Sequence, residues 1–225
     1  KTGIVNHFLY ADTAILDPLL TLGLPQNITA FSGTDAIIHA LEALNSKLAN
    51  DYTNLLAREA LSLLFTNIRN AFNNGIDYNA RSNMLYGSML AGKAFANSSV
   101  AAIHAFAYPI GAEFHIPHGQ ANAIMLLPVL KFNLETGIHN YKVVAEAIGI
   151  DIKNKTDRQI SEEIVNAFDN LLNDLKIDRQ LSKFGITKHH VPDLAAAAMK
   201  VTRLMSNNPR EFKLEDAERM YYEAL

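Results

Sequence analysis

The chain has 225 residues, 49% of them hydrophobic and 19% charged, and a formal net charge of −3. These proportions are typical of globular proteins, and the negative balance without a Lys/Arg cluster argues against nucleic-acid binding. There is no cysteine, which excludes disulfides and thiolate metal ligands. No apolar run approaches the roughly 18 residues of a membrane span, so we expect no membrane partner.

The first 31 residues lack helical periodicity. Ile4-Val5 and His7–Tyr10 are compatible with short extended pieces, and Ala14–Leu16 reads as a brief strand stopped by Asp17-Pro18. We therefore expect a short extended N-terminal segment. The helical pattern begins where Ser32 or Thr34 could cap a first helix that runs to about residue 47.

Apolar residues at helical spacing continue through the rest of the chain. Thr156 and Gln159 have the spacing of a capping box at the start of a helix. The pattern predicts an all-α domain of eight or nine helices, over residues 32–47, 51–72, 78–96, both sides of a turn at 115–117, 141–148, 156–175, 192–204 and 214–225.

Two groups of residues carry metal-binding chemistry. Asp35 and His39 are four residues apart, so on a helix they share a face. His104, His115 and His118 fall within fifteen residues of an apolar stretch. A lone helical histidine is more often a satisfied core or surface residue than a ligand. One carboxylate with three imidazoles would nevertheless form a suitable ligand set for a divalent transition metal.

The two groups together match a family pattern. GTDAIIHALEAL resembles the Gly-x-Asp-(x)3-His-x-x-Glu helix of the iron-containing (group III) alcohol dehydrogenases. HAFAYPIGAEFHIPHGQANA resembles their block His-(x)4-Pro-(x)8-His-Gly-x-x-Asn-Ala. Asn208-Pro209-Arg210 is similar to the closing motif of the family. The resemblance covers nearly the whole chain.

The resemblance implies a multi-helix, dehydroquinate synthase-like α-domain and particular site residues. Asp35, His39, His104 and His118 would be the metal ligands, with Fe²⁺ as the expected ion and Zn²⁺ as the alternative. Phe95 corresponds to a position that lines the substrate pocket. Ala101-Ala102 stand where relatives favour a Gly-rich approach to the first histidine of the block.

Tyr108 departs from the family pattern, because most relatives carry a histidine at this position. We expect Tyr108 to act catalytically by orienting the substrate or the nicotinamide through its hydroxyl. Proton transfer would then run through water or His115. Glu42 and Glu113 could accept imidazole N–H groups, but exposed charge is the expectation for both.

The nicotinamide cofactor has no visible site in this sequence. The resemblance implies hydride transfer with NAD or NADP, yet nothing matches the Gly-Gly-Gly-Ser phosphate loop of the family. We therefore expect residues 1–31 to join a missing N-terminal dinucleotide-binding domain and 32–225 to form the catalytic, metal-binding half. The isolated chain would be inactive, and the full-length enzyme would be a cytoplasmic homo-oligomer, a dimer, acting on a small alcohol or aldehyde.

Two other interpretations remain open at this stage. The chain could resemble glycerol dehydrogenases or hydroxyacid–oxoacid transhydrogenases of the same superfamily. It could also be a non-catalytic helical module with a structural metal. Structural sites are closed, so a pocket open on one side of the ligands would favour catalysis.

Overall fold

The computed structural model describes all residues except 1–5, 10, 136 and 138. Within this part of the chain there are ten α-helices and no strand, which confirms the all-α prediction. The α-helices are α1 (Gln26–Asn45), α2 (Asp51–Asn73), α3 (Tyr78–Ser98), α4 (Ala102–Glu113), α5 (His118–Leu134), α6 (His139–Ala147), α7 (Asp157–Asp174), α8 (Val191–Met199), α9 (Thr202–Met205) and α10 (Leu214–Glu223).

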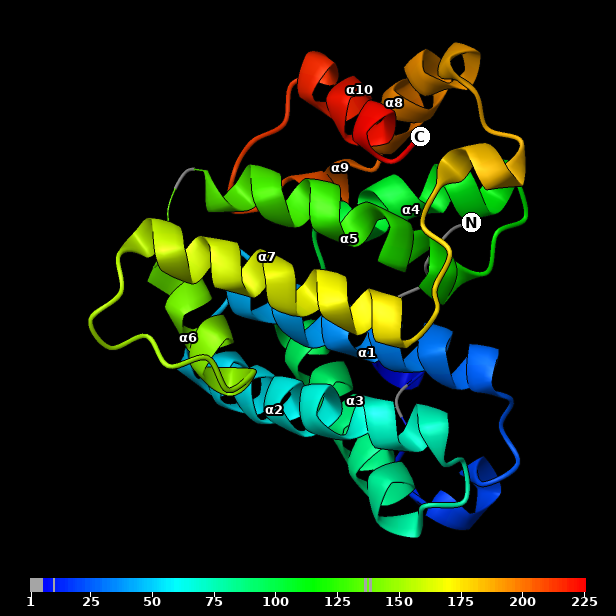
Figure 1. Cartoon of the computed structure of the whole chain (residues 1–225), viewed down its shortest axis with the longest axis vertical. Helices are drawn as coiled ribbons and strands as arrows, with labels where there is room; N and C mark the ends of the chain where they lie inside the picture. Colours follow the sequence, from blue (N-terminus) through cyan, green and yellow to red (C-terminus); the bar gives the residue numbers. More distant parts are fainter. Residues whose placement is uncertain (1–5, 10, 136, 138) are drawn as a thin grey trace.

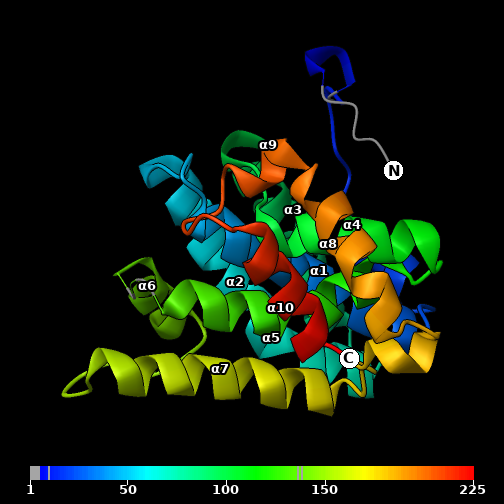
Figure 2. The same cartoon turned by 90° about the horizontal axis from the view of Figure 1, so that it is seen from above.

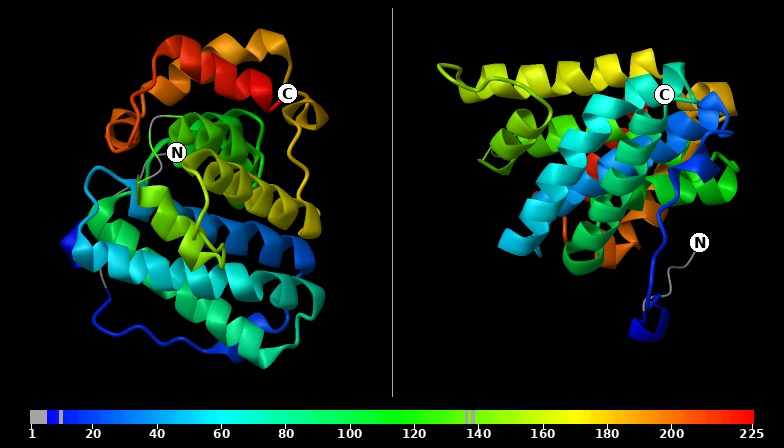
Figure 3. Two further views of the ribbon diagram at one scale, coloured as in Figure 1. Left: turned by 60° about the vertical axis from the view of Figure 1, so that its left-hand side comes forward. Right: turned by 90° about the horizontal axis from the view of Figure 1, so that it is seen from below.

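Helix α1 lies at the centre of the domain (Figure 1). It packs against α2 and α3 on one side and against α5 on the other, while α8 and α10 pack on each other beyond α4 and α5 (Figures 1 and 3). Ile37 and Ile38 are fully buried although they point to different faces of α1. A helix that is apolar nearly all round belongs in a core, because no face of it is suited to water.

Helix α5 begins in very close contact with α1. A Cβ atom added at Gly119 would lie 2.2 Å from the backbone carbonyl oxygen of Phe31. Only glycine allows this approach, because a backbone oxygen cannot rotate away as a side chain can. The contact fixes His118, the first residue of α5, beside the middle of α1.

The start of α1 differs from the prediction. The helix begins at Gln26 after Pro25, not at residue 32, so Ser32 and Thr34 lie inside it and cap nothing. Ser32 instead donates its hydroxyl hydrogen bond to the carbonyl oxygen of Ile28, one turn earlier.

The N-terminal segment contains no strand in its described residues. Ala14–Leu16 has no regular structure, and His7–Leu9 forms a 3₁₀ turn where an extended piece was predicted; Ile4-Val5 lies outside the described residues. A second 3₁₀ turn, Pro18–Thr21, is capped by the Asp17 side chain. Figure 2 shows the segment running away from the helical body. Among the described helices, none combines the length and apolar character needed to cross a membrane.

Candidate metal centre

Asp35 is the centre of a cluster built by three helices. It shares α1 with His39, one turn on, and faces His104 from α4 and His118 from α5. Its Oδ1 lies 3.6 Å from Nε2 of His104 and 3.7 Å from Nε2 of His118. Its Oδ2 lies 3.9 Å from Nε2 of His39. The close packing of α5 on α1 thus brings together residues more than 80 positions apart.

These separations are too long for hydrogen bonds but suit ligands of one ion. Two donors held about 2.1 Å from a metal at the tetrahedral angle lie about 3.4 Å apart. One donor atom each from Asp35, His39 and His104 lies within 4.8 Å of the other two. The Nε2 of His104 is buried and has no hydrogen-bond partner in the described structure. A buried nitrogen without a hydrogen-bond partner is suited to bind a cation.

His118 approaches Asp35 but stands outside that compact group of three. The Asn122 side-chain nitrogen lies between them, 2.5 Å from Oδ1 of Asp35 and 3.2 Å from Nε2 of His118. Donation to both leaves the Nε2 of His118 unprotonated, as a ligand nitrogen must be. Asn122 was missed in the sequence as a site residue, although its position one turn after His118 on α5 is a signal for it.

The expectation that Glu42 is exposed is wrong. Glu42 is only 4% exposed, and its Oε2 accepts a 2.6 Å hydrogen bond from Nδ1 of His104. Its Oε1 accepts a second bond, 2.7 Å long, from the backbone N–H of Ile103 at the start of α4. A carboxylate on Nδ1 directs Nε2 toward the cluster and raises its basicity. Glu113 is exposed, as expected.

Burial and the interactions between neighbouring groups strongly shift the pKa values of the side chains in the cluster. Burial opposes ionisation of Asp35, but the neighbouring imidazoles of His104, His39 and His118 lower its pKa below the ordinary value. Burial and the charge of His104 lower the pKa of His39 to about 4. Burial also disfavours charge on His104, yet Glu42 and Asp35 raise its pKa to about 9. At neutral pH a cation would compete with a proton at His104.

A cleft of about 590 Å³ opens beside the cluster. Phe95 and Tyr108 both line it, together with His39, His104 and His118. The Phe95 ring stacks on His39, with centroids 4.4 Å apart, and the Tyr108 ring centroid is 6.0 Å from that of His118. Both residues stand where a substrate role requires, and those roles remain predictions.

Two residues alter the sequence-based picture of this cleft. His115 lies exposed in the turn between α4 and α5 and does not line the cleft. Its position therefore does not support a role for His115 in proton transfer. Arg203, from α9, lines the cleft and was missed. No sequence signal pointed to it, because α9 reaches the site only through the packing of the chain's last third.

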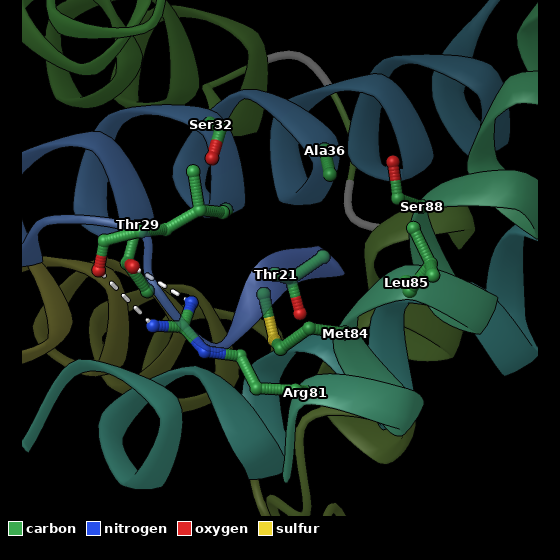
Figure 4. Close-up of a pocket in the computed structure, with 10 residues that line it drawn as sticks. Thr21, Thr29, Ser32, Ala36, Arg81, Met84, Leu85 and Ser88 are labelled. Carbon is green, nitrogen blue, oxygen red and sulfur yellow. Dashed lines mark hydrogen bonds between the residues drawn. The ribbon is translucent and has the colours of Figure 1, made fainter. Parts of the chain in front are cut away.

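A second, smaller hollow of about 120 Å³ lies on another face of α1, between α1 and α3 (Figure 4). Arg81 is buried at its edge, where it donates to Oγ1 of Thr29 (Figure 4), to the carbonyl oxygen of Leu24 and to that of Gly75. Because Arg81 belongs to α3, these bonds connect α3 to the first turn of α1 and to the loops that precede α1 and α3. Arg81 therefore has a structural task that accounts for its burial.

The chain is thus a helical domain with a cluster of one carboxylate and three imidazoles beside a cleft. Residues 29–225 match the family described as "Fe-containing alcohol dehydrogenase family, C-terminal". The chain belongs to this family, as the sequence motifs indicated.

Individual relatives agree with this assignment. Sulfoacetaldehyde reductase of Bilophila wadsworthia is 38% identical over 214 residues, 93% of this chain and 55% of the relative. Long-chain-alcohol dehydrogenase 1 of Geobacillus thermodenitrificans is 36% identical over 224 residues, 100% of this chain and 56% of the relative. The crystal structure of a 1,3-propanediol oxidoreductase superposes with a TM-score of 0.90 at 34% identity, over 93% of this chain and 55% of that one. The chain spans about half the length of these relatives.

Replacing Glu42 with glutamine tests how His104 is held. Glutamine keeps the size and can still accept from Ile103, but it removes the charge that binds the Nδ1–H of His104. We expect the pKa of His104 to fall from about 9 and divalent-metal affinity to fall roughly 10–100-fold. Imidazole NMR titration and competition with a chelator measure the two effects.

Glu113→Gln is the matched control, because Glu113 lies at the end of α4 with its side chain exposed. It should leave both values unchanged. Unaltered metal affinity in Glu42→Gln, with an intact thermal transition, would show that Glu42 does not position His104.

Proposed function

We propose that this chain supplies the metal-binding, catalytic half of an NAD(P)-linked alcohol dehydrogenase or aldehyde reductase. The observation that carries the proposal is the buried Nε2 of His104, which lacks a hydrogen-bond partner in the described structure and faces Asp35. Asp35, His39, His104 and His118 would hold a divalent ion, Fe²⁺ in the first place and Zn²⁺ as the alternative. That ion would supply Lewis acidity to the alcohol or carbonyl oxygen of a substrate.

The residues of the chain would prepare the substrate for hydride transfer. In the reducing direction a bound nicotinamide would supply the hydride for the carbonyl carbon, and a proton would have to reach the carbonyl oxygen, so the products would be an alcohol and NAD(P)⁺. Burial raises the pKa of the Tyr108 phenol, so its hydroxyl stays protonated at neutral pH and can donate a hydrogen bond. Phe95, stacked on His39, would offer an apolar ring to the substrate beside the cluster.

The nicotinamide would be bound outside this chain. No Gly-rich phosphate loop occurs in the sequence, and residues 1–31 would form the junction to a dinucleotide-binding domain. A structure of one relative, a sulfoacetaldehyde reductase from Bifidobacterium kashiwanohense, is described as a complex with NAD⁺. The substrate would be a small alcohol or aldehyde, and the complete enzyme a cytoplasmic homodimer.

A structural metal in a non-catalytic module is the second candidate. The cleft of about 590 Å³ lined by His39, His104 and His118 speaks against it, because structural sites are closed by their ligands. Glycerol dehydrogenase-like or transhydrogenase-like activity would use the same cleft with other substrates.

The proposal has a direct test in two forms of the protein. The anaerobically purified chain is expected to bind one divalent ion, measured by elemental analysis, and to show no alcohol oxidation. The same chain joined to a nucleotide-binding half should reduce small aldehydes with NADH or NADPH, followed by nicotinamide absorbance. Micromolar NADH binding by the isolated chain would contradict the placement of the cofactor, and absence of metal would overturn the proposal.

A further inference from the structure

The cleft beside the cluster has an unusual charge pattern. Among its lining residues in the described part of the chain, only Arg203 carries a fixed charge. Apart from the three histidines, the rest are apolar or neutral: Asn6, Leu9, Leu48, Gly92, Phe95, Ala96, Asn97, Ser99, Val100 and Tyr108. As the only fixed positive charge in this lining, the exposed guanidinium of Arg203 would favour the entry of molecules that carry a negative charge.

Arg203 has no carboxylate partner among the described residues. Five other arginines pair with carboxylates, for example Arg179 with Asp169 at 2.6 Å and Arg210 with Glu135 at 2.6 Å, whereas Arg58 and Arg81 do not in the described part of the chain. The guanidinium of Arg203 makes one long contact of 3.4 Å, from Nη1 to the hydroxyl of Ser99. Since a guanidinium has five N–H donors, most of its capacity to bind an oxyanion is left over.

Ser99 adds a second polar group at the same place. Its backbone has φ of 65° and ψ of 165°, a conformation that favours glycine and that side chains rarely adopt. The strained turn after α3 holds the Ser99 hydroxyl next to Arg203. A hydroxyl and a guanidinium side by side form a suitable pair of donors for one anionic group.

The net charge of the site also favours an anionic ligand. Asp35 and Glu42 contribute two negative charges, which a divalent ion between neutral imidazoles would cancel. Arg203 then leaves the cleft with one net positive charge. A neutral alcohol would leave that charge uncompensated, whereas a substrate with one negative charge would balance it.

We infer that Arg203 binds an anionic group at the far end of the substrate, which makes the preferred substrate a short aldehyde, or its alcohol, that ends in a carboxylate or sulfonate. This inference rests on the proposed function, since it assigns the substrate class of the same site. The reactive carbon would lie at the cluster and the oxyanion at Arg203 and Ser99, across a cleft of about 590 Å³. Such a volume suits a small molecule held at both ends.

A matched pair of aldehydes tests the inference in the enzyme that includes the nucleotide-binding half. 4-Oxobutanoate and 4-methylpentanal have the same shape, but the first ends in a carboxylate and the second in two methyl groups. We expect kcat/KM to favour 4-oxobutanoate by at least about tenfold. Arg203→Gln should lower kcat/KM for 4-oxobutanoate roughly 10–100-fold, the range of a charge-assisted hydrogen bond, and leave 4-methylpentanal within about twofold.

Lys200→Gln removes the same charge three residues away from an exposed position, and should change neither value. Binding of 4-hydroxybutanoate to the chain, followed by NMR, provides a readout without turnover and should weaken about tenfold or more in Arg203→Gln.

The outcomes separate the inference from the function it rests on. Equal use of both aldehydes, with no response to Arg203→Gln, would overturn the role of Arg203 and leave the dehydrogenase function standing. Reduction of neither aldehyde would count against the proposed function, and the assigned substrate class would fall with it. Loss of 4-hydroxybutanoate binding in Arg203→Gln alone would support the anionic subsite.

Discussion

Replacing Asp35 with asparagine is expected to lower divalent-metal affinity by at least about a hundredfold while the chain stays folded. Among the described residues, Asp35 is the only carboxylate that faces His39, His104 and His118 together. Glu42 cannot substitute for it, because both of its oxygens already accept hydrogen bonds. Asparagine has the same shape and can still accept from Asn122, so the change removes charge and little else.

Competition between the protein and a chelator of known affinity measures the effect, with circular dichroism as the check on folding. Asp174→Asn is the matched control: Asp174 is exposed and pairs with Arg69 at 2.6 Å, on the surface and away from the cluster. It should bind metal as the unaltered chain does. If Asp35→Asn and Asp174→Asn bind equally well, the imidazoles around Asp35 are a packing arrangement and not a metal site.

Short-range signals in the sequence predicted the elements that depend on short-range interactions. The capping box of Thr156 and Gln159 is present, and α7 begins at Asp157, directly after Thr156. The same reasoning failed for α1, where Ser32 and Thr34 looked like caps but lie inside a helix that begins at Gln26. The first turns of α1 are held by contacts with Gly119 and Arg81, which follow in the chain by more than 50 residues.

The residues of the candidate site show the same difference between short-range signals and long-range contacts. Asp35 and His39 share a helix face by spacing alone, and the motif that contains His104 and His118 could be matched to a family. Glu42 occupies the last position of the Gly-x-Asp-(x)3-His-x-x-Glu motif, but the sequence does not show its burial, because its partners Ile103 and His104 lie about sixty residues further on. The two segments meet only when α4 and α5 pack in the core, so the burial of Glu42 is a property of the fold.

Replacing Gly119 with alanine is expected to lower the free energy of unfolding by about 3 kcal/mol or more. The added Cβ would lie 2.2 Å from the carbonyl oxygen and 2.6 Å from the carbonyl carbon of Phe31. Both atoms belong to the backbone of α1, so relief requires the whole of α5 to move. For a domain of this size the loss corresponds to a fall in Tm of roughly 6–12 °C.

The same displacement should weaken metal binding, because His118 precedes Gly119 and would move away from Asp35 with α5. Gly92→Ala is the matched control: Gly92 lies within α3 and a Cβ there meets nothing within 4 Å. Alanine is favoured over glycine inside a helix by about 1 kcal/mol, so the Tm of this variant should be equal or higher. Thermal unfolding measures both variants. If Gly119→Ala has the same Tm as the unaltered chain, α5 can shift freely and the contact with Phe31 does not hold His118 at the cluster.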